Sequence, residues 1–201
     1  IQKRMVESLG ERAERIRGGG VSASVDNMLK VTNDGRKLAL DQRMIDPLLP
    51  DEDGSKVNAC VGEVYRIWSE TADQKSAQLL FCDLSTPKSD GSFNVYDDIR
   101  KKLIARGIPA DEIKFIHEAD AEAKKQELFK KVRRGEVRVL IGSTAKMGAG
   151  TNVQNKLIAS HDLDCPWRPS DLEQRAGRTV RQGNENPVVG LYRYVTEETF
   201  L

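Results

Sequence analysis

The chain has 201 residues and a formal net charge of +1, with 32 basic and 31 acidic side chains. That length is enough for one well-buried core and a smaller appendage. The balanced charge excludes a generally basic nucleic-acid binder, so any contact with DNA has to come from local donors. The three cysteines show neither a metal-ligand spacing nor a disulfide framework, and no apolar run reaches membrane-spanning length. These features favour a cytoplasmic protein that is not embedded in a membrane.

The first 54 residues are expected to form helices and turns rather than part of a sheet. A charged helix is predicted over residues 1–17, ended by three glycines at 18–20. Two short helices are predicted over 26–31 and 36–43, and a turn at 33–35 separates them. The arginines of the first helix face either solvent or DNA, and solvent is the favoured interpretation.

From residue 55 onward, short apolar strands alternate with helices, which is typical of an α/β fold with a mostly parallel sheet covered on both faces. His117 and His161 are expected to be core or strand-end residues rather than ligands. Gly107 and Gly135 suit the left-handed position that ends a helix. Helices are predicted over 55–71, 95–106 and 121–134, and strands over 77–82, 113–117, 137–144, 157–161 and 188–195.

A loop of small residues follows the predicted strand 137–144. Gly148 and Gly150 allow backbone N–H groups to approach a ligand closely and to adopt positive φ. Such loops commonly hold the phosphates of a nucleotide or of a nucleic-acid backbone. The loop stands at the end of a strand, where ligands collect in parallel sheets, and is therefore a candidate binding element.

The most informative segment runs from Asp171 to Gly183. Gln174, Arg178 and Arg181 are spaced four and three residues apart, which on an α-helix places them on one face. Two guanidiniums beside a glutamine suit a triphosphate, because each offers a rigid fork of donors that matches phosphate oxygens. The competing interpretation is a surface helix whose arginines only face solvent or pair with acids.

Taken together, these segments resemble a known family. The order of Thr144, Gly148, Gly150 and Asn152, then D-C-P-W-R-P at 164–169, then Q-R-A-G-R-T-V-R-Q-G at 174–183, is similar to motifs V and VI of superfamily-two helicases. The Trp-Arg-Pro segment and the trailing Gln-Gly make the Swi/Snf-type branch the best match. The resemblance runs from about residue 55 to residue 196. It implies a RecA-like three-layer sandwich over residues 55–201, preceded by a helical linker over residues 1–54.

The resemblance also implies roles for particular residues. In the family, this region is the second motor lobe of a nucleic-acid-dependent ATPase. Arg178 and Arg181 correspond to arginine fingers, and Gln174 corresponds to the residue that sets the attacking water or contacts the γ-phosphate. The nucleotide site is expected to include Gly148, Gly150, Asn152 and Gly177. The residues expected to contact nucleic-acid phosphates are Ser85, Thr86, Thr144 and Thr151. No metal ligand is expected.

Two motifs of related enzymes do not occur in the sequence. It contains no G-x-x-x-x-G-K-S/T phosphate loop and no D-E-x-H or D-E-A-D magnesium motif, which related enzymes carry on their first lobe. We therefore expect the chain to be part of a longer protein whose first RecA-like lobe holds most of ATP and Mg²⁺. The chain alone is expected to hydrolyse ATP poorly or not at all. It is expected to contact the sugar-phosphate backbone of DNA rather than the bases.

Two other interpretations stay open. One is a non-catalytic lobe that binds DNA or a partner and targets an attached enzyme, although the intact Gln174, Arg178 and Arg181 argue against it. The N-terminal residues 27–41 also resemble large phage and mobile-element proteins that join such a helicase to an N6-adenine DNA methylase, but no methylase motif is present. The second interpretation is a stand-alone phosphotransferase. Against it, the chain lacks the lysine and carboxylate set that a metal-bound nucleotide needs. Translocation along a duplex is favoured over strand separation.

Overall fold

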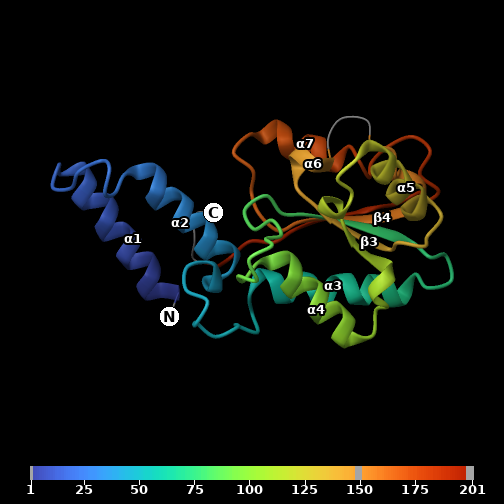
Figure 1. Ribbon diagram of the computed structural model, residues 1–201, viewed down its shortest axis with the longest axis horizontal. Helices are drawn as coiled ribbons and strands as arrows, with labels where there is room; N and C mark the ends of the chain where they lie inside the picture. The colour runs from blue at the N-terminus through green and yellow to red at the C-terminus, as the bar shows by residue number, and fades with distance from the viewer. Residues whose placement is uncertain (1, 148–150, 198–201) are drawn as a thin grey trace.

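The computed structural model describes residues 2–147 and 151–197. Two N-terminal helices, α1 (Gln2–Arg17) and α2 (Met28–Leu40), and the 3₁₀ turn η1 (Gln42–Met44) precede an α/β lobe (Figure 1). The lobe consists of α3 (Lys56–Glu70), β1 (Ala77–Phe81), α4 (Val95–Arg106), η2 (Ala110–Glu112), β2 (Ile113–Phe115), η3 (Ile116–Glu118), α5 (Glu122–Arg133), β3 (Val139–Gly142), α6 (Thr144–Met147), η4 (Gln154–Lys156), β4 (Leu157–Asp162), α7 (Pro169–Ala176) and β5 (Gly190–Arg193).

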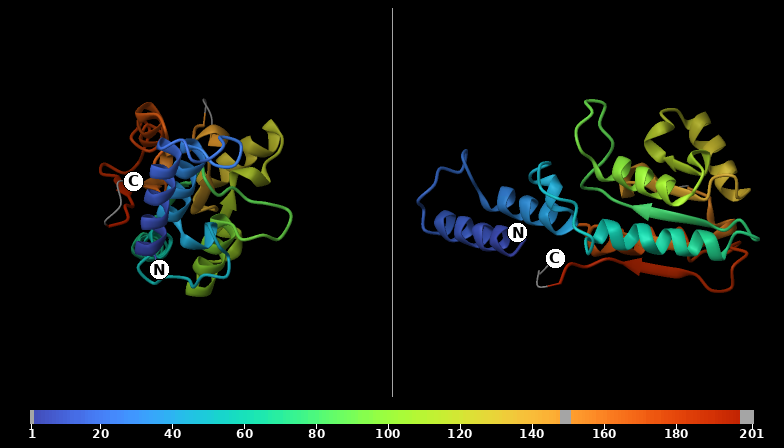
Figure 2. Two further views of the ribbon diagram at one scale, coloured as in Figure 1. Left: turned by 90° about the vertical axis from the view of Figure 1, so that its left-hand side faces the viewer. Right: turned by 90° about the horizontal axis from the view of Figure 1, so that it is seen from below.

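The described strands form one sheet with the order β2-β3-β1-β4-β5, in which every pairing is parallel. Helices α3 and α4 cover one face, and α5, α6 and α7 lie on the other (Figure 1). The α/β fold class, with its three layers and its parallel sheet, is thus confirmed. The arrowheads of β1 and β5 point toward the side of the molecule on which α1 and α2 lie (Figure 2). The N-terminal helices therefore stand at the carboxyl edge of the sheet.

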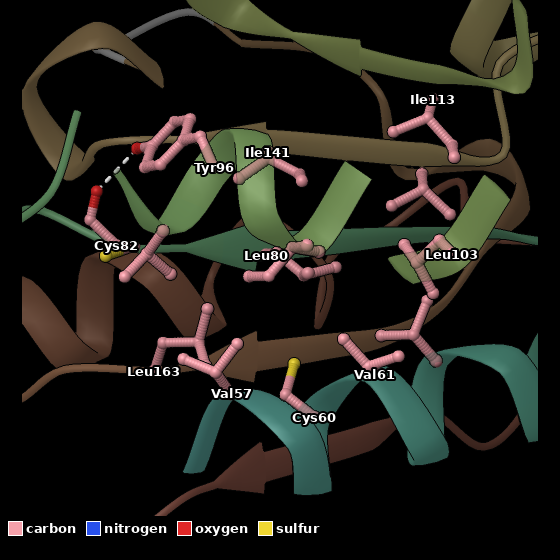
Figure 3. Close-up of a cluster of buried hydrophobic side chains, with 14 of the residues drawn as sticks. Val57, Cys60, Val61, Leu80, Cys82, Tyr96, Leu103, Ile113, Ile141 and Leu163 are labelled. Atoms are coloured by element: carbon pink, nitrogen blue, oxygen red, sulfur yellow. Dashed lines mark hydrogen bonds between the residues drawn. The ribbon is translucent and has the colours of Figure 1, made fainter. Parts of the chain in front are cut away.

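Two apolar clusters hold the layers together, one on each face of the sheet. On the α3–α4 side, Leu80 and Ile141 pack against Val61 and Leu103, and all four are buried (Figure 3). Tyr96 of α4 donates its hydroxyl to the carbonyl of β1's neighbour Cys82, so its polar end is satisfied inside this cluster. The second cluster lies beneath α5. Every residue of β1 is buried, as expected for a strand covered on both faces.

Local signals explain the ends of the predicted helices. Ser55 caps α3 by accepting a hydrogen bond from the N–H of Asn58, and Asn94 caps α4 by accepting one from the N–H of Asp97. Helix α4 ends at Gly107, whose φ of 117° is left-handed. The predicted bounds of α4 are confirmed, and α3 and α5 lie within one residue of their predicted ends.

The predicted turn at 33–35 is wrong, because α2 runs through it as one unbroken helix. Val31 and Leu38 lie on the buried side of α2, and a continuous helix is what brings both into contact with the rest of the molecule. Asp34 also receives a hydrogen bond from Arg12 of α1 at 2.9 Å. Burial and this ion pair outweigh the intrinsic cost of glycine in a helix, which is about 1 kcal/mol.

His161 is a core residue, as expected. It is fully buried in β4, its Nδ1 lies 2.8 Å from the hydroxyl of Tyr194, and its Nε2 lies 2.8 Å from Oε1 of Gln78. Burial lowers the pKa of His161 to about 3, with a smaller contribution in the same direction from the charge of Arg66. Among the described residues, no helix has the length and apolar character needed to cross a membrane.

Candidate site at the carboxyl edge of the sheet

A fully buried arginine organises the carboxyl edge of the sheet. Arg175 of α7 donates from Nη2 to Oδ2 of Asp83 and to Oδ1 of Asp164, each at 2.9 Å. Its Nη1 donates to the carbonyl of Asp164 at 2.9 Å and lies 3.3 Å from Oδ1 of Asp162. Its Nε donates to Oγ1 of Thr144 at 2.8 Å. One guanidinium therefore joins residues that follow or end three different strands, β1, β3 and β4; we call these five residues the Arg175 cluster.

The Arg175 cluster combines one cation with three carboxylates. Burial alone would lower the pKa of Arg175, but the carboxylates of Asp164, Asp83 and Asp162 outweigh it and raise that pKa. Burial raises the pKa of Asp162, against the opposing effect of Arg175. Asp164 also accepts the backbone N–H groups of Asp83 and Leu84, at 2.6 and 2.8 Å. The cluster is thus a frame that fixes the loops at the ligand edge.

No role for Arg175 was predicted from the sequence. A signal was available, because an aspartate ends or follows the first and fourth strands, and two carboxylates brought together need a buried cation. Arg175 lies inside the motif Q-R-A-G-R and is buried, whereas the preceding Gln174 is exposed. Its burial becomes evident only once the strands are placed side by side.

An open pocket of about 490 Å³ lies beside the Arg175 cluster. It brings together Thr86 and Thr144, predicted to contact nucleic acid, with Gln174, predicted to act on the nucleotide. The hydroxyl of Thr144 donates to Oδ2 of Asp83 at 3.0 Å, so its hydrogen is already engaged. Thr86 and the exposed Gln174 are among the polar side chains that line this pocket. The lining residues are Asp83, Thr86, Ser143, Thr144, Ala145, Asp171 and Gln174.

Two of the other predicted nucleic-acid contacts are buried. Ser85 is 4% exposed, and its Oγ accepts the backbone N–H of Val95 at 2.8 Å, at the start of α4. Thr151 is also buried, and its carbonyl accepts a hydrogen bond from Arg181 at 3.1 Å. The geometry gives Ser85 a structural role in this state of the lobe and places Thr151 beside one of the predicted arginine fingers.

Gln174, Arg178 and Arg181 do not share one helix face, and that prediction is wrong. Helix α7 ends at Ala176, and the chain continues as a series of turns in which Arg181 donates its N–H to the carbonyl of Thr179 at 3.0 Å. Thr179 is fully buried, and its carbonyl accepts a hydrogen bond from Asn184 at 3.1 Å. The chain thus leaves the helical path after Ala176 and buries Thr179 in the turns that follow.

The two arginines nonetheless lie near each other, in the segment 177–183 that we call the arginine turn. Burial, and to a smaller extent the charge of Arg181, lower the pKa of Arg178. In the ranges 2–147 and 151–197, no ion pair links either arginine to a carboxylate. Adjacent cations without acidic partners form a favourable site for a multiply charged anion.

The remaining predicted nucleotide contacts are placed as follows. Asn152 is exposed, and its carbonyl accepts a hydrogen bond from Arg133 of α5. Gly177 is the residue at which α7 ends, and its N–H donates to the carbonyl of Glu173 at 2.9 Å. Gly148 and Gly150 lie outside the described residues. Asn152 therefore leaves its side chain available, whereas Gly177 has an evident structural role.

A parallel sheet that is covered on both faces and carries polar loops at its carboxyl edge defines the class of α/β ligand-binding lobes. Residues 70–183 match the family described as the helicase conserved C-terminal domain, and this match covers more than half of the chain. The chain belongs to that family.

The chain is also similar to individual known proteins. The chain is 40% identical over 77 residues to YqhH of Bacillus subtilis (strain 168), an uncharacterized ATP-dependent helicase, and this match covers 37% of the chain but only 13% of that protein. Among solved structures, the C-terminal part of the Fun30 ATPase domain has the same fold, with a TM-score of 0.54 at 17% identity over 78% of this chain and 47% of that one. The helicase domain of Hef from Pyrococcus furiosus matches with a TM-score of 0.47 and 19% identity, covering 94% of this chain and 35% of that one.

Proposed function

We propose that this chain is the second motor lobe of a nucleic-acid-dependent ATPase of the Swi/Snf type. A nucleotide would bind in a cleft between this lobe and a first lobe of the same polypeptide. The single observation that carries the proposal is that Arg178 and Arg181 both lie in the arginine turn that follows α7, where neither forms an ion pair with a carboxylate in the described ranges. A surface helix whose arginines only balanced acids would not have this arrangement.

The donor set fits the triphosphate of ATP. When bound, ATP with Mg²⁺ supplies the phosphoryl group to be transferred and the metal charge that neutralises its oxygens. Arg178 and Arg181 would bind and orient the phosphate oxygens and stabilise negative charge there. Asn152, with an exposed side chain, would contact the nucleotide sugar. No group of three or more metal-ligating side chains occurs in the part of the chain that the structure describes, and we assign Mg²⁺ to the first lobe.

Nucleic acid would lie over the pocket lined by Thr86, Thr144 and Gln174. Hydroxyl and amide groups suit the phosphate and sugar oxygens of a backbone, which position the strand without reading its sequence. Because Gln174 lines this pocket, we propose that it contacts nucleic acid in addition to its proposed role at the nucleotide. Closing and opening of the two lobes around ATP would move the protein along duplex DNA.

The experiment uses the longer protein that contains this chain, with the chain alone as the comparison. ATP hydrolysis is measured with and without duplex DNA, and with single-stranded DNA of the same sequence. The proposal expects hydrolysis by the longer protein that DNA increases, greatest with duplex, and no measurable hydrolysis by the chain alone. DNA binding by the longer protein without any ATP hydrolysis would overturn it and would favour a targeting lobe, for instance one attached to a DNA methylase.

A further inference from the structure

Arg36 of α2 lies against the segment that joins β4 to α7. Its side chain is buried, its Nη2 donates to the carbonyl of Cys165 at 2.7 Å, and its Cζ lies 4.4 Å from the ring centre of Trp167. Trp167 is 61% exposed, so the guanidinium stacks on an indole that otherwise faces solvent. A hydrogen bond from a charged donor and a cation–π contact together fix the position of this segment.

The segment that Arg36 holds is short and has a firm attachment at each end. It begins at Asp164, whose carboxylate is bound to Arg175 and to two backbone N–H groups. It ends at Pro169, the first residue of α7, which leads to Gln174 and on to the arginine turn. A shift of the residues between these two ends would therefore change the position of the first residue of α7, and with it the orientation of this helix.

Helices α1 and α2 form a unit that meets the lobe through α2. Arg12 of α1 binds Asp26 and Asp34, which ties α1 to α2 and to the loop before it. The end of α2 contacts the lobe through Ala39, whose carbonyl accepts the hydroxyl of Thr196 at 2.7 Å. Arg36 is thus the residue of this helical unit that contacts the segment leading to α7, on the side of the lobe where Figure 1 shows α2.

We infer that Arg36 is a positioning residue that transmits the placement of α1 and α2 to α7 and the arginine turn. The inference rests on the proposed function, because α7 affects turnover only if Arg178 and Arg181 meet a nucleotide. Arg36 touches neither nucleotide nor DNA in this assignment. Its role is to link the position of α1 and α2 to that of α7 and the arginine turn.

The contact is tested first on the described chain, without reference to activity. The chain has two tryptophans, Trp68 and Trp167, so labelling with 5-fluorotryptophan gives two ¹⁹F resonances. Arg36→Ala is expected to shift and narrow the Trp167 resonance. The Trp68 resonance, which reports on the fold, should stay unchanged. Lys37→Ala, which removes the same charge from the next position of α2, is the matched control and should move neither resonance.

The coupling is then tested in the longer protein. Arg36→Ala is expected to lower the DNA-stimulated kcat for ATP about tenfold while the KM for ATP changes less than about twofold, because positioning rather than binding is lost. Arg36→Lys retains the charge but not the planar stack, and should recover only part of the rate. Lys37→Ala should behave as the unmodified protein.

Each outcome decides between the two claims. An unchanged Trp167 resonance in Arg36→Ala overturns the inference and leaves the proposed function standing. A shifted resonance with an unchanged stimulated rate also overturns it, because the contact then has no effect on the site. An unmodified longer protein that hydrolyses no ATP overturns the proposed function, and the inference with it.

Discussion

The Nε of Arg175 donates to Oγ1 of Thr144 at 2.8 Å, which joins α7 directly to the first residue of α6. Through this bond, one buried guanidinium supports both the pocket that holds Thr86 and Gln174 and the helix that leads to the arginine turn. The ligand edge of the lobe is therefore built around a charge that no ligand reaches, since the side chain of Arg175 is fully buried.

Arg175→Ala is expected to destabilise the lobe severely. It leaves the carboxylate of Asp164 buried without its counter-charge, and breaking a buried ion pair in this way costs about 3–5 kcal/mol. The free energy of unfolding, measured by urea denaturation, checks this. The control is Arg193→Ala, because Arg193 is exposed and lies 3.5 Å from Asp162; its loss should cost less than about 1 kcal/mol. Equal costs for the two variants would contradict the role given to Arg175.

Arg181→Ala in the longer protein should abolish DNA-stimulated ATP hydrolysis and leave DNA affinity unchanged. Removing an arginine finger lowers the rate roughly 10³–10⁵-fold, and Arg181→Lys should fall between, because lysine keeps the charge but not the forked donor geometry. Arg134→Ala, at an exposed arginine that ends α5, is the control. Steady-state hydrolysis and a DNA-binding titration are both needed. Normal turnover in Arg181→Ala would remove the assigned role.

The stability of the lobe should fall as the pH drops from about 6.5 toward 4. His161 takes up a proton near pH 6.5 when unfolded, but its pKa in the folded lobe is about 3, so the unfolded state binds more protons across this window. One proton corresponds to about 1.4 kcal/mol for each pH unit. His161→Gln should lower stability at pH 7 and flatten this slope, as measured by urea denaturation at several pH values. A slope that is the same in the variant would assign the pH dependence to other groups.

Gly135→Ala should destabilise the lobe more than Gly91→Ala. Both glycines have left-handed φ, 75° at Gly135 and 74° at Gly91, which costs alanine about 1–2 kcal/mol at either position. At Gly135 an added Cβ would also lie 2.7 Å from the carbonyl oxygen of Lys75, whereas at Gly91 nothing lies within 4 Å. Overpacking of this kind costs roughly a further 1–3 kcal/mol. Thermal unfolding of the two variants checks the difference, and a smaller effect at Gly135 would contradict the close approach of Lys75 to this turn.

Features that depend on neighbouring residues were predictable from the sequence. Helix α4 ends where Gly107 permits a left-handed backbone, and β1 is recognisable because a mostly apolar run is typical of a strand covered on both faces. The burial of His161 follows from its place within such a run. For the helix end and the strand, the determining signal lies within a few residues along the chain.

Features that depend on distant contacts were not predictable in the same way. The glycine and asparagine at 33–35 indicated a turn, but contacts of α2 with α1 keep the helix intact. The end of α7 depends on the burial of Thr179 and on Asn184, which are placed by the fold of the following segment. The roles of Gln174, Arg178 and Arg181 remain predictions, since they concern a bound ligand rather than the lobe itself.

The sheet order places β5 at one margin, with Leu191 and Arg193 turned outward on a strand of four residues. A margin strand presents open backbone donors and acceptors, which invite pairing with a strand of another molecule. Arg193, 57% exposed and 3.5 Å from the carboxylate of Asp162, places a charged side chain on this margin, which disfavours such pairing between identical copies. Purified lobes should accordingly stay dispersed best at low ionic strength, where repulsion between these margins is least screened.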